Sequence, residues 1–232
     1  MTARKVLSVP DTRLREISDP VTEFGDDLKS LVQDMVDTIE VQGGAGLAAP
    51  QIGTPRRVLA IRPKLFVDEN PDTSYSQDTW VLVNPVVRPS GLKQRWQEAC
   101  LSVPHGSGNV ERHGECEVKY QRVDGTEHTV TVGWPLAGAV QHENDHLNGI
   151  LYVDHVGNLE RSMILRKVEK TQKLVAQAAE LRKEQEILDL RGPKALLKYR
   201  AEKSGQALPE SEERRHLRST DVSSAKSDTH NY

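Results

Sequence analysis

The stretch "QHENDHLNG", residues 141–149, places two histidines four positions apart, with a glutamate directly after the first. Side chains four positions apart on an α-helix lie one above the other, so His142 and His146 can direct both imidazoles at one ion. Glu143 stands beside them, where a carboxylate can take a proton from a metal-bound water. The stretch therefore predicts a helical metal site with a built-in base.

The residues before this stretch predict that the helix is buried. Pro135 suits a first helical turn, because its missing N–H would have no partner there. Leu136, Val140 and Leu147 share one stripe that faces the core, and the Asn–Gly pair at 148–149 indicates the helix end.

The rest of the chain predicts an α+β protein. Residues 26–41 carry apolar side chains at helical spacing and indicate a first amphipathic helix that stops at "QGGAG". Short β-rich runs follow at 56–61, 79–87, 115–123 and 127–132. Asp124-Gly125 indicates a hairpin between the last two, and residues 62–78 indicate a surface loop. We expect small antiparallel or mixed sheets packed around a central metal-binding helix, with a C-terminal helical extension.

Composition and charge narrow the class of protein. With 36% hydrophobic and 28% charged residues, the 232-residue chain is globular rather than disordered. The N-terminal residues lack the continuous apolar run of a signal peptide, and no apolar run approaches the roughly 20 residues of a membrane span. We expect a cytoplasmic protein without a membrane partner, whose two cysteines, Cys100 and Cys116, are thiols.

A catalytic metal site keeps three protein ligands and leaves one position to water, so a third ligand is needed. The downstream candidates are Asp145, Asp154 and His155, and the upstream candidate is Cys100 in "QEACLSVP". Spacing alone does not choose among them, and a lone cysteine is as often an ordinary buried thiol.

Three stretches together resemble the peptide deformylase family: "GAGLAAPQ" at 44–51, "EACLS" at 98–102 and "QHENDH" at 141–146. They occur in the family's order and at its usual separations, which makes them far more specific than one motif. The resemblance runs from about residue 6 to residue 168. It implies a catalytic domain over residues 1–168. The mixture of apolar and charged residues that follows predicts a charged helical extension over residues 169–232 that ends in a disordered tail.

The resemblance implies that Cys100, His142 and His146 are the metal ligands. The family's metal is typically Fe²⁺, for which Ni²⁺, Co²⁺ or Zn²⁺ can substitute. A thiolate suits such borderline metals and makes a ferrous site sensitive to oxygen.

The resemblance also implies the reaction, which removes the N-formyl group from the N-terminal formyl-methionine of newly made polypeptides and releases formate. Glu143 takes a proton from the metal-bound water and returns it to the leaving amine. The side-chain amide of Gln51, the backbone N–H of Leu101 and the metal stabilise the oxyanion.

The expected substrate side begins at the first motif. Gly44 and Gly46 let the backbone come close enough for Gln51 to reach the metal and for a peptide to lie alongside as an extra strand. Glu98 is placed on this side too, where we expect it to pair with an arginine or to orient the cysteine loop. The methionine pocket is expected to be bounded by Ala45, Trp96, Gly138 and Ala139.

Some positions depart from the family's usual residues. Ala99 stands where a glycine is usual, and Ser107 stands where many relatives carry an arginine, in the polar segment 105–111 that we expect to be flexible. Small residues at 138 and 139 replace larger aliphatic ones, which widens the methionine pocket unless Trp96 fills the space.

Two other functions stay open from the residues alone. A metallopeptidase of the H-E-x-x-H type shares the water activation but does not predict the cysteine motif or the role of Gln51. A ribosome-binding protein with an inactive site has no need for Glu143 and Gln51 together.

The extension is basic, because residues 159–203 hold 12 Lys and Arg against 7 Asp and Glu. It suits contact with ribosomal RNA, and the competing interpretation is a solvated helix.

Overall fold

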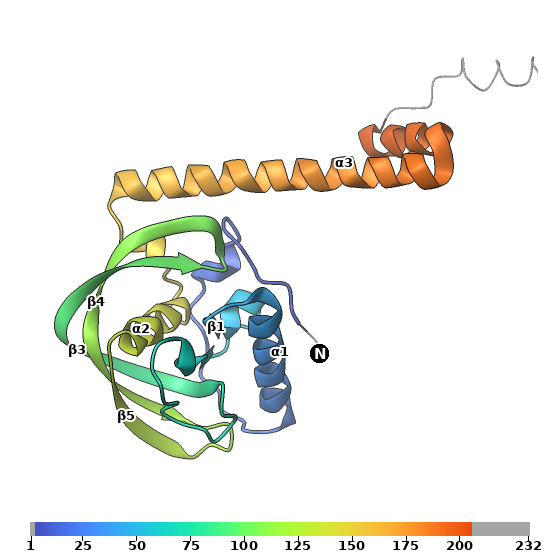
Figure 1. Cartoon of the computed structure of the whole chain (residues 1–232). Helices are drawn as coiled ribbons and strands as arrows, with labels where there is room; N and C mark the ends of the chain where they lie inside the picture. The colour runs from blue at the N-terminus through green and yellow to red at the C-terminus, as the bar shows by residue number, and fades with distance from the viewer. Residues whose placement is uncertain (1–2, 206–232) are drawn as a thin grey trace, which may run out of the picture. The chain divides into compact units, whose positions relative to one another are not determined.

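The computed structural model describes residues 3–205, which include all the helices and strands discussed below (Figure 1). The chain divides into two compact units, Met1–Thr171 and Gln172–Tyr232. The longer helices are α1 (Asp26–Gln42), α2 (Leu136–His146) and α3 (Asn158–Ser204), and the strands are β1 (Gly46–Ala48), β2 (Val58–Ile61), β3 (Trp80–Cys100), β4 (Val103–Gln121) and β5 (Glu127–Gly133).

The strands form one five-stranded sheet in the order β1-β2-β3-β4-β5, and every neighbouring pair is antiparallel. Each β-rich run predicted from the sequence lies mainly within one of these strands, so the α+β prediction is confirmed. The predicted hairpin between β4 and β5 is also confirmed. Its turn places Gly125 at φ 88°, a left-handed conformation that favours glycine, and Arg122 N–H donates to the Thr126 carbonyl at 2.9 Å.

The sheet curves around α2, which occupies its concave side (Figure 1). Leu136, Val140 and Leu147 are buried as predicted, in a cluster that includes Leu59 and Trp80 of the sheet. This packing holds the helix in a fixed orientation toward β3 and β4, since both ends of the apolar stripe are anchored.

Helix α1 packs against the end of the sheet formed by β1 and β2, and the first family motif, residues 44–51, follows it directly. Its buried face, which includes Val32 and Met35, packs with residues of β1 and β2. The helix ends at Gly43, which has φ 65°, and Gly44 N–H donates to the Ile39 carbonyl at 3.0 Å. The chain therefore turns at once into β1.

Strands β3 and β4 are much longer than the predicted runs. The prediction that residues 105–111 are flexible was wrong. That segment belongs to β4 and pairs with β3, with Ala99 opposite Ser107. Gly106 and Gly108 are sites of close packing rather than of mobility. A Cβ on Gly106 would lie 2.8 Å from the Tyr152 hydroxyl and 3.0 Å from Ile164, so only glycine fits under these side chains.

Helix α3 confirms the predicted C-terminal helical extension, although it already begins at Asn158. Within the first unit, its residues Ile164 and Val168 are buried in a cluster with Val103, Leu151 and Tyr152. None of the helices within residues 3–205 combines the length and the apolar content that a membrane crossing requires.

The second unit is a helical hairpin within the part of α3 that follows residue 171. The helix breaks at Gly192, which has φ 77° and is followed by Pro193. The segment after the break returns along the segment before it, where Arg200 pairs with Glu184 and Tyr199 donates to Glu180. The predicted disordered tail lies largely outside the described residues.

Candidate metal centre

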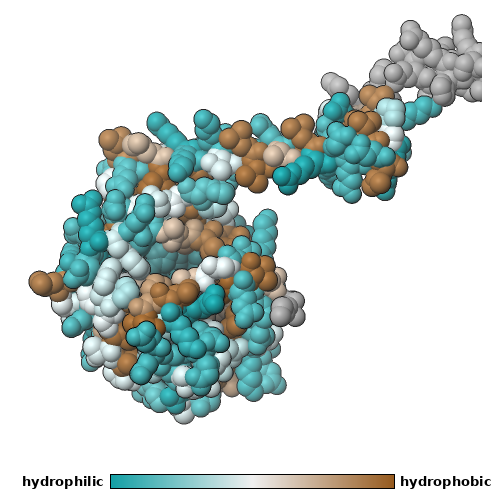
Figure 2. Space-filling model, viewed as in Figure 1, coloured by the Kyte–Doolittle hydropathy of each residue, from teal (hydrophilic) through white to brown (hydrophobic). Residues whose placement is uncertain are grey.

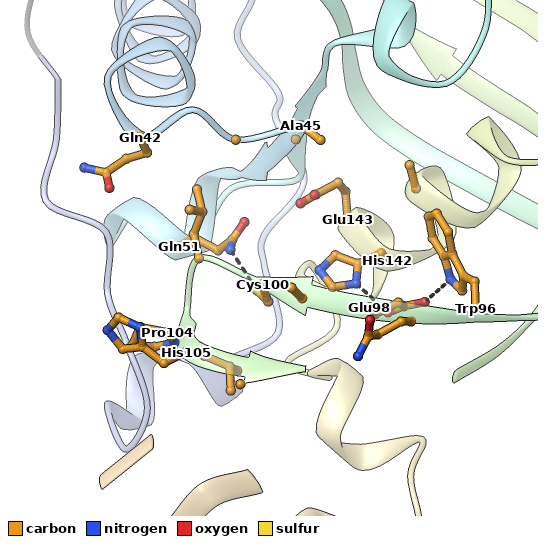
Figure 3. Close-up of a pocket in the computed structure, with 18 of the residues that line it drawn as sticks. Gln42, Ala45, Gln51, Trp96, Glu98, Cys100, Pro104, His105, His142 and Glu143 are labelled. Carbon is orange, nitrogen blue, oxygen red and sulfur yellow. Dashed lines mark hydrogen bonds and ion pairs between the residues drawn. The ribbon is translucent and has the colours of Figure 1, made fainter. Parts of the chain in front are cut away.

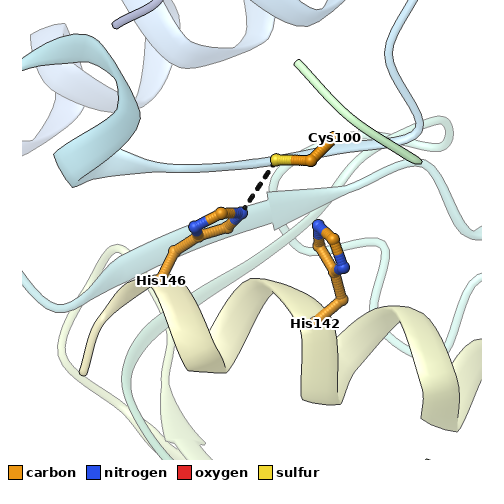
Figure 4. Close-up of side chains that lie close together, drawn as sticks. All are labelled: Cys100, His142 and His146. Atoms are coloured by element: carbon orange, nitrogen blue, oxygen red, sulfur yellow. Dashed lines mark hydrogen bonds between the residues drawn. The ribbon is translucent and has the colours of Figure 1, made fainter. Parts of the chain in front are cut away.

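Cys100, His142 and His146, which come from two elements, converge at one point (Figure 4). One sulfur and two imidazole nitrogens all lie within 4.8 Å of one another, and Cys100 Sγ is 3.3 Å from His146 Nε2. Cys100 is the last residue of β3, and both histidines lie on the α2 face that the sheet encloses. Among residues 3–205, this is the one group with such geometry. The donor set suits a borderline divalent cation.

The protonation of the two histidines also fits a cation. Burial lowers the pKa of His142, but hydrogen bonds with Cys100 and Glu98 outweigh it and raise the pKa well above its usual value. Burial and the neighbouring charge of His142 hold the pKa of His146 well below its usual value. The metal-free cluster therefore keeps a proton that a cation would replace, so metal binding releases protons.

Glu98, two positions before Cys100 on β3, holds the ligand His142 in place. Its Oε2 lies 2.7 Å from His142 Nδ1, which leaves Nε2 of that ring for a metal. Arg112 donates to both carboxylate oxygens, at 2.8 and 3.0 Å. Burial alone would raise the pKa of Glu98, but the hydrogen bonds from His142 and Arg112 hold it well below its usual range. The Glu98 carboxylate that bonds His142 is therefore negatively charged.

Glu143 reaches the same cavity from the next position on α2. Burial raises its pKa to about 7. Its Oε2 is buried and has no hydrogen-bond partner among the described residues. Because a buried carboxylate oxygen costs free energy when it is unpaired, this atom marks a place for a water or a substrate group.

Gly46 of β1 makes room for this carboxylate. A Cβ at that position would lie 2.5 Å from Glu143 Oε1 and 2.9 Å from its carboxyl carbon. Gly44 has a different neighbour, since its Cβ would lie 3.1 Å from Leu101 Cδ1. The two glycines of the first motif therefore let β1 approach both the base and the loop that follows Cys100.

Gln51 is buried and held at both ends of its amide. Its Oε1 accepts from Ala48 N–H at 2.8 Å, while Nε2 donates to Ser102 Oγ at 3.1 Å and lies 3.5 Å from Cys100 Sγ. The donor end of the amide is therefore fixed beside the ligand sulfur (Figure 3). That placement suits a donor to an oxygen bound near the metal.

A cavity of about 530 Å³ opens over these residues (Figure 3). It is lined by the predicted residues Gly44, Ala45, Gly46, Gln51, Trp96, Glu98, Cys100, Leu101, Ala139, His142 and Glu143. The sequence reasoning missed Phe66 and the rim residues Gln42 and His105, which also line it. His105 has φ 64°, and nothing in its local sequence indicates that conformation.

Gly138 does not line this cavity, unlike the other three residues of the predicted methionine pocket. A Cβ there would lie 3.0 Å from the Trp96 ring and 2.9 Å from the Trp134 ring. The two rings are 4.8 Å apart and occupy the space that small side chains on α2 leave. The methionine pocket is therefore not widened next to Gly138, because the two indole rings fill that space.

The other candidate ligands lie elsewhere. Asp154 pairs with Arg15 and Arg161, and Asp145 pairs with Arg112 and His155. Arg112 was not identified from the sequence, although a pairing of Glu98 with some arginine was predicted. The alternation of β4 contains the signal, because Arg112 occupies the inward position between Val110 and Cys116 on that strand.

The sequence profile of the family described as polypeptide deformylase matches residues 3–162. The chain belongs to this family. The peptide deformylase of Erythrobacter litoralis is 40% identical over 189 residues, which cover 73% of this chain and 97% of that protein. The deformylase of Pelagibacter ubique is 37% identical and is covered over 95% of its length.

Solved deformylase structures have the same fold. The crystal structure from Legionella pneumophila matches with a TM-score of 0.67 at 38% identity, covering 75% of this chain and 98% of that one. The deformylase of Ehrlichia chaffeensis in complex with actinonin matches with a TM-score of 0.66 at 30% identity, covering 74% and 98%.

A peptide deformylase is a hydrolase that removes the N-formyl group from nascent peptides, and the family depends on a metal. The profile ends at residue 162, shortly after α3 begins, so most of α3 lies beyond the part of the chain that defines the family.

Proposed function

We propose that this deformylase cleaves the formyl group from N-terminal formyl-methionine of new polypeptides in the cytoplasm, with Cys100, His142 and His146 holding Fe²⁺. Ni²⁺, Co²⁺ or Zn²⁺ would substitute, since one thiolate and two imidazoles suit each of them. The observation that carries the proposal is the convergence of these three donors beside the unpaired carboxylate oxygen of Glu143.

The chemistry divides between the cation and the protein. When bound, a divalent cation supplies Lewis acidity, which lowers the pKa of water and polarises a carbonyl oxygen. Glu143 then acts as the proton carrier, because its pKa of about 7 lets it take a proton from the attacking water and give it to the leaving amine near neutral pH.

Gln51 and Leu101 stabilise the charge that grows on the formyl oxygen. The Gln51 amide is prevented from rotating by its bonds to Ala48 and Ser102, so its donor end needs no reorganisation during the reaction. The Leu101 backbone N–H follows directly after the ligand Cys100 in the cavity wall. Donors of this kind typically contribute about 2.7 to 4 kcal/mol each.

The cavity gives the substrate its place. Gly44, Ala45 and Gly46 present backbone along one wall, where an extended peptide can pair as an added strand. The methionine side chain of the substrate would contact Trp96 and Ala139, with Phe66 nearby. Glu98 also lines the cavity, and it supports the site indirectly because its carboxylate bonds both His142 and Trp96.

The proposal is tested by formate release from formyl-Met peptides with protein loaded anaerobically with Fe²⁺. The matched control is Glu143→Gln, which keeps the size of the side chain and removes its proton chemistry. We expect the variant to retain its metal and to lose about 10²- to 10⁴-fold in kcat. Absence of formate release by the metal-loaded wild type would overturn the proposal, and so would full activity of the variant.

We extend the proposal to the partner of α3. Residues 172–204 hold eight Lys and Arg against five Asp and Glu, and clustered positive charge favours phosphate-rich surfaces such as ribosomal RNA. Ribosome co-sedimentation should weaken with rising salt and should be lost on truncation after Thr171. Co-sedimentation that survives truncation would instead favour a solvated helix without this partner.

A further inference from the structure

Strand β3 and helix α2 face each other along a series of matched positions. Alternate residues of a strand share one face and are spaced by about 6.6 to 6.8 Å, while residues four apart on a helix are spaced by about 6 Å. Two matched pairs belong to the metal centre: Cys100 with His146, and Glu98 with His142. The next position on each element is Trp96 on β3 and Gly138 on α2.

These two residues form a third matched pair by packing. Trp96 packs so close to the helix that a Cβ on Gly138 would come within 3.0 Å of its ring. The Trp134 ring makes an edge contact with the indole at a centroid distance of 4.8 Å, and the Phe66 ring lies 6.5 Å away. Because the ring is confined on several sides, its N–H has a defined direction.

That N–H points at Glu98. Trp96 Nε1 donates to Glu98 Oε1 at 2.8 Å (Figure 3). The carboxylate thus receives four hydrogen bonds, two per oxygen: from Trp96, twice from Arg112 and from His142. Removing the indole N–H would leave one oxygen with Arg112 as its single donor and weaken the restraint that keeps the carboxylate aligned with His142.

We propose that Trp96 is a positioning residue for the metal centre, which fixes the Glu98 carboxylate through its N–H and thereby orients His142. The proposal rests on the metal site of the proposed function and assigns a second role to a residue of the substrate wall. The same indole that contacts a substrate side chain also holds the support of a metal ligand, so the two sites share one rigid group. Groups that support a metal ligand in this way typically contribute 10- to 100-fold to metal affinity.

The test compares two matched variants, Trp96→Phe and Trp134→Phe. Both replace an indole of the same cluster with a smaller apolar ring, but only Trp96 donates to Glu98. Metal-free full-length proteins are titrated with Co²⁺ against a competing chelator, and the visible absorption of the Co²⁺ site is recorded. We expect Trp96→Phe to lose about 10- to 100-fold in Co²⁺ affinity and to shift the absorption bands. Trp134→Phe should match the wild type in both readouts.

Gly138→Ala provides a second route if Trp96→Phe proves unfolded by circular dichroism. Its methyl group pushes the intact indole away from α2, so it should weaken Co²⁺ binding in the same way. Wild-type affinity in Trp96→Phe overturns the proposal, as does an equal loss in both tryptophan variants, which would assign the effect to ring packing. These measurements need no substrate, so they decide the role of Trp96 even if formate release fails.

Discussion

Helices α2 and α3 distribute their polar and apolar residues in opposite ways. Helix α2 has 11 residues and buries nine of them, including Gln141, His142, Glu143 and His146. Helix α3 has 47 residues, and the described part buries only Ile164 and Val168. Its apolar side chains lie in the open among polar ones, with Leu174 and Leu181 more than half exposed (Figure 2).

The difference shows that the burial of polar side chains on α2 depends on specific partners. Gln141 bonds both backbone groups of His113 on β4, and His142 bonds Glu98 on β3. Buried polar groups of this kind stabilise a fold only when they are paired. Three buried side-chain atoms of α2 have no hydrogen-bond partner among the described residues: Glu143 Oε2, Asn144 Oδ1 and His146 Nδ1. Of these three residues Glu143 alone lines the cavity, so its unpaired carboxylate oxygen is the one that can meet a water or a substrate group.

The largest effect should come from breaking this pairing at Glu98. Glu98→Gln keeps the shape but places amide hydrogens among four donors, and it removes the more deeply buried of the two carboxylates that pair with Arg112. We expect the metal-free variant to lose about 3 to 5 kcal/mol in the free energy of unfolding, measured with urea.

Glu117→Gln is the matched control for this prediction. Glu117 also pairs with an arginine, but its partner Arg88 is 76% exposed, and such surface pairs contribute about 0 to 1 kcal/mol. Equal urea midpoints for the two variants would show that burial does not distinguish the two carboxylates.

The next effect concerns the pH dependence of stability at Glu143. Burial raises its folded-state pKa to about 7 from 4.5, so between these pH values the folded protein holds a proton that the unfolded chain has lost. The group therefore makes the metal-free protein progressively less stable as pH rises through this window. The full penalty is roughly 3 kcal/mol above pH about 7, at about 1.4 kcal/mol per pKa unit.

Glu143→Gln removes this titration. Its stability advantage over the metal-free wild type should be absent below pH about 4.5 and should grow until pH about 7. A difference between the two proteins that stays constant from pH 5 to 8, in urea unfolding at each pH, would contradict the raised pKa.

A smaller effect is expected where β1 touches the same carboxylate. Gly46→Ala places a methyl group against Glu143 Oε1, so the carboxylate must move. A displacement of about 1 Å typically costs about 10²-fold in kcat. Gly133→Ala is the control, since a Cβ there meets nothing within 4 Å. Metal content should stay unchanged in both, and full activity of Gly46→Ala would show that Glu143 tolerates the shift.

The structure of the α2 region was also the easiest to predict from the sequence. Its helix, its apolar stripe and the pairing of His142 with His146 follow from four-residue spacing, which is a local property of the chain. The runs that became β2 and β5 follow from their local β-rich composition as well. The peptide deformylase resemblance then selected Cys100 from the candidate ligands, and the structure places its sulfur beside both rings.

What the sequence did not predict depends on contacts between distant segments. The polar residues 105–111 have no β-like composition, and they extend β4 because β3 and Tyr152 lie on either side of Gly106 and Gly108. Arg112 acts through Glu98 on another strand, and Trp134 packs against Trp96, which is distant in sequence. Neither partner can be read from local periodicity, because the register between β3, β4 and α2 sets these contacts.

The smallest effect should come from the exposed apolar residues of α3. Leu181 is 65% exposed in the second unit, so Leu181→Gln removes little apolar burial. We expect the free energy of unfolding to change by no more than about 0.5 kcal/mol, measured by urea denaturation. Ile164→Ala, on the buried side of the same helix, should cost about 2 kcal/mol or more. A loss for Leu181→Gln as large as that for Ile164→Ala would mean that a partner covers Leu181 in solution, and the contrast between the two helices would then not hold.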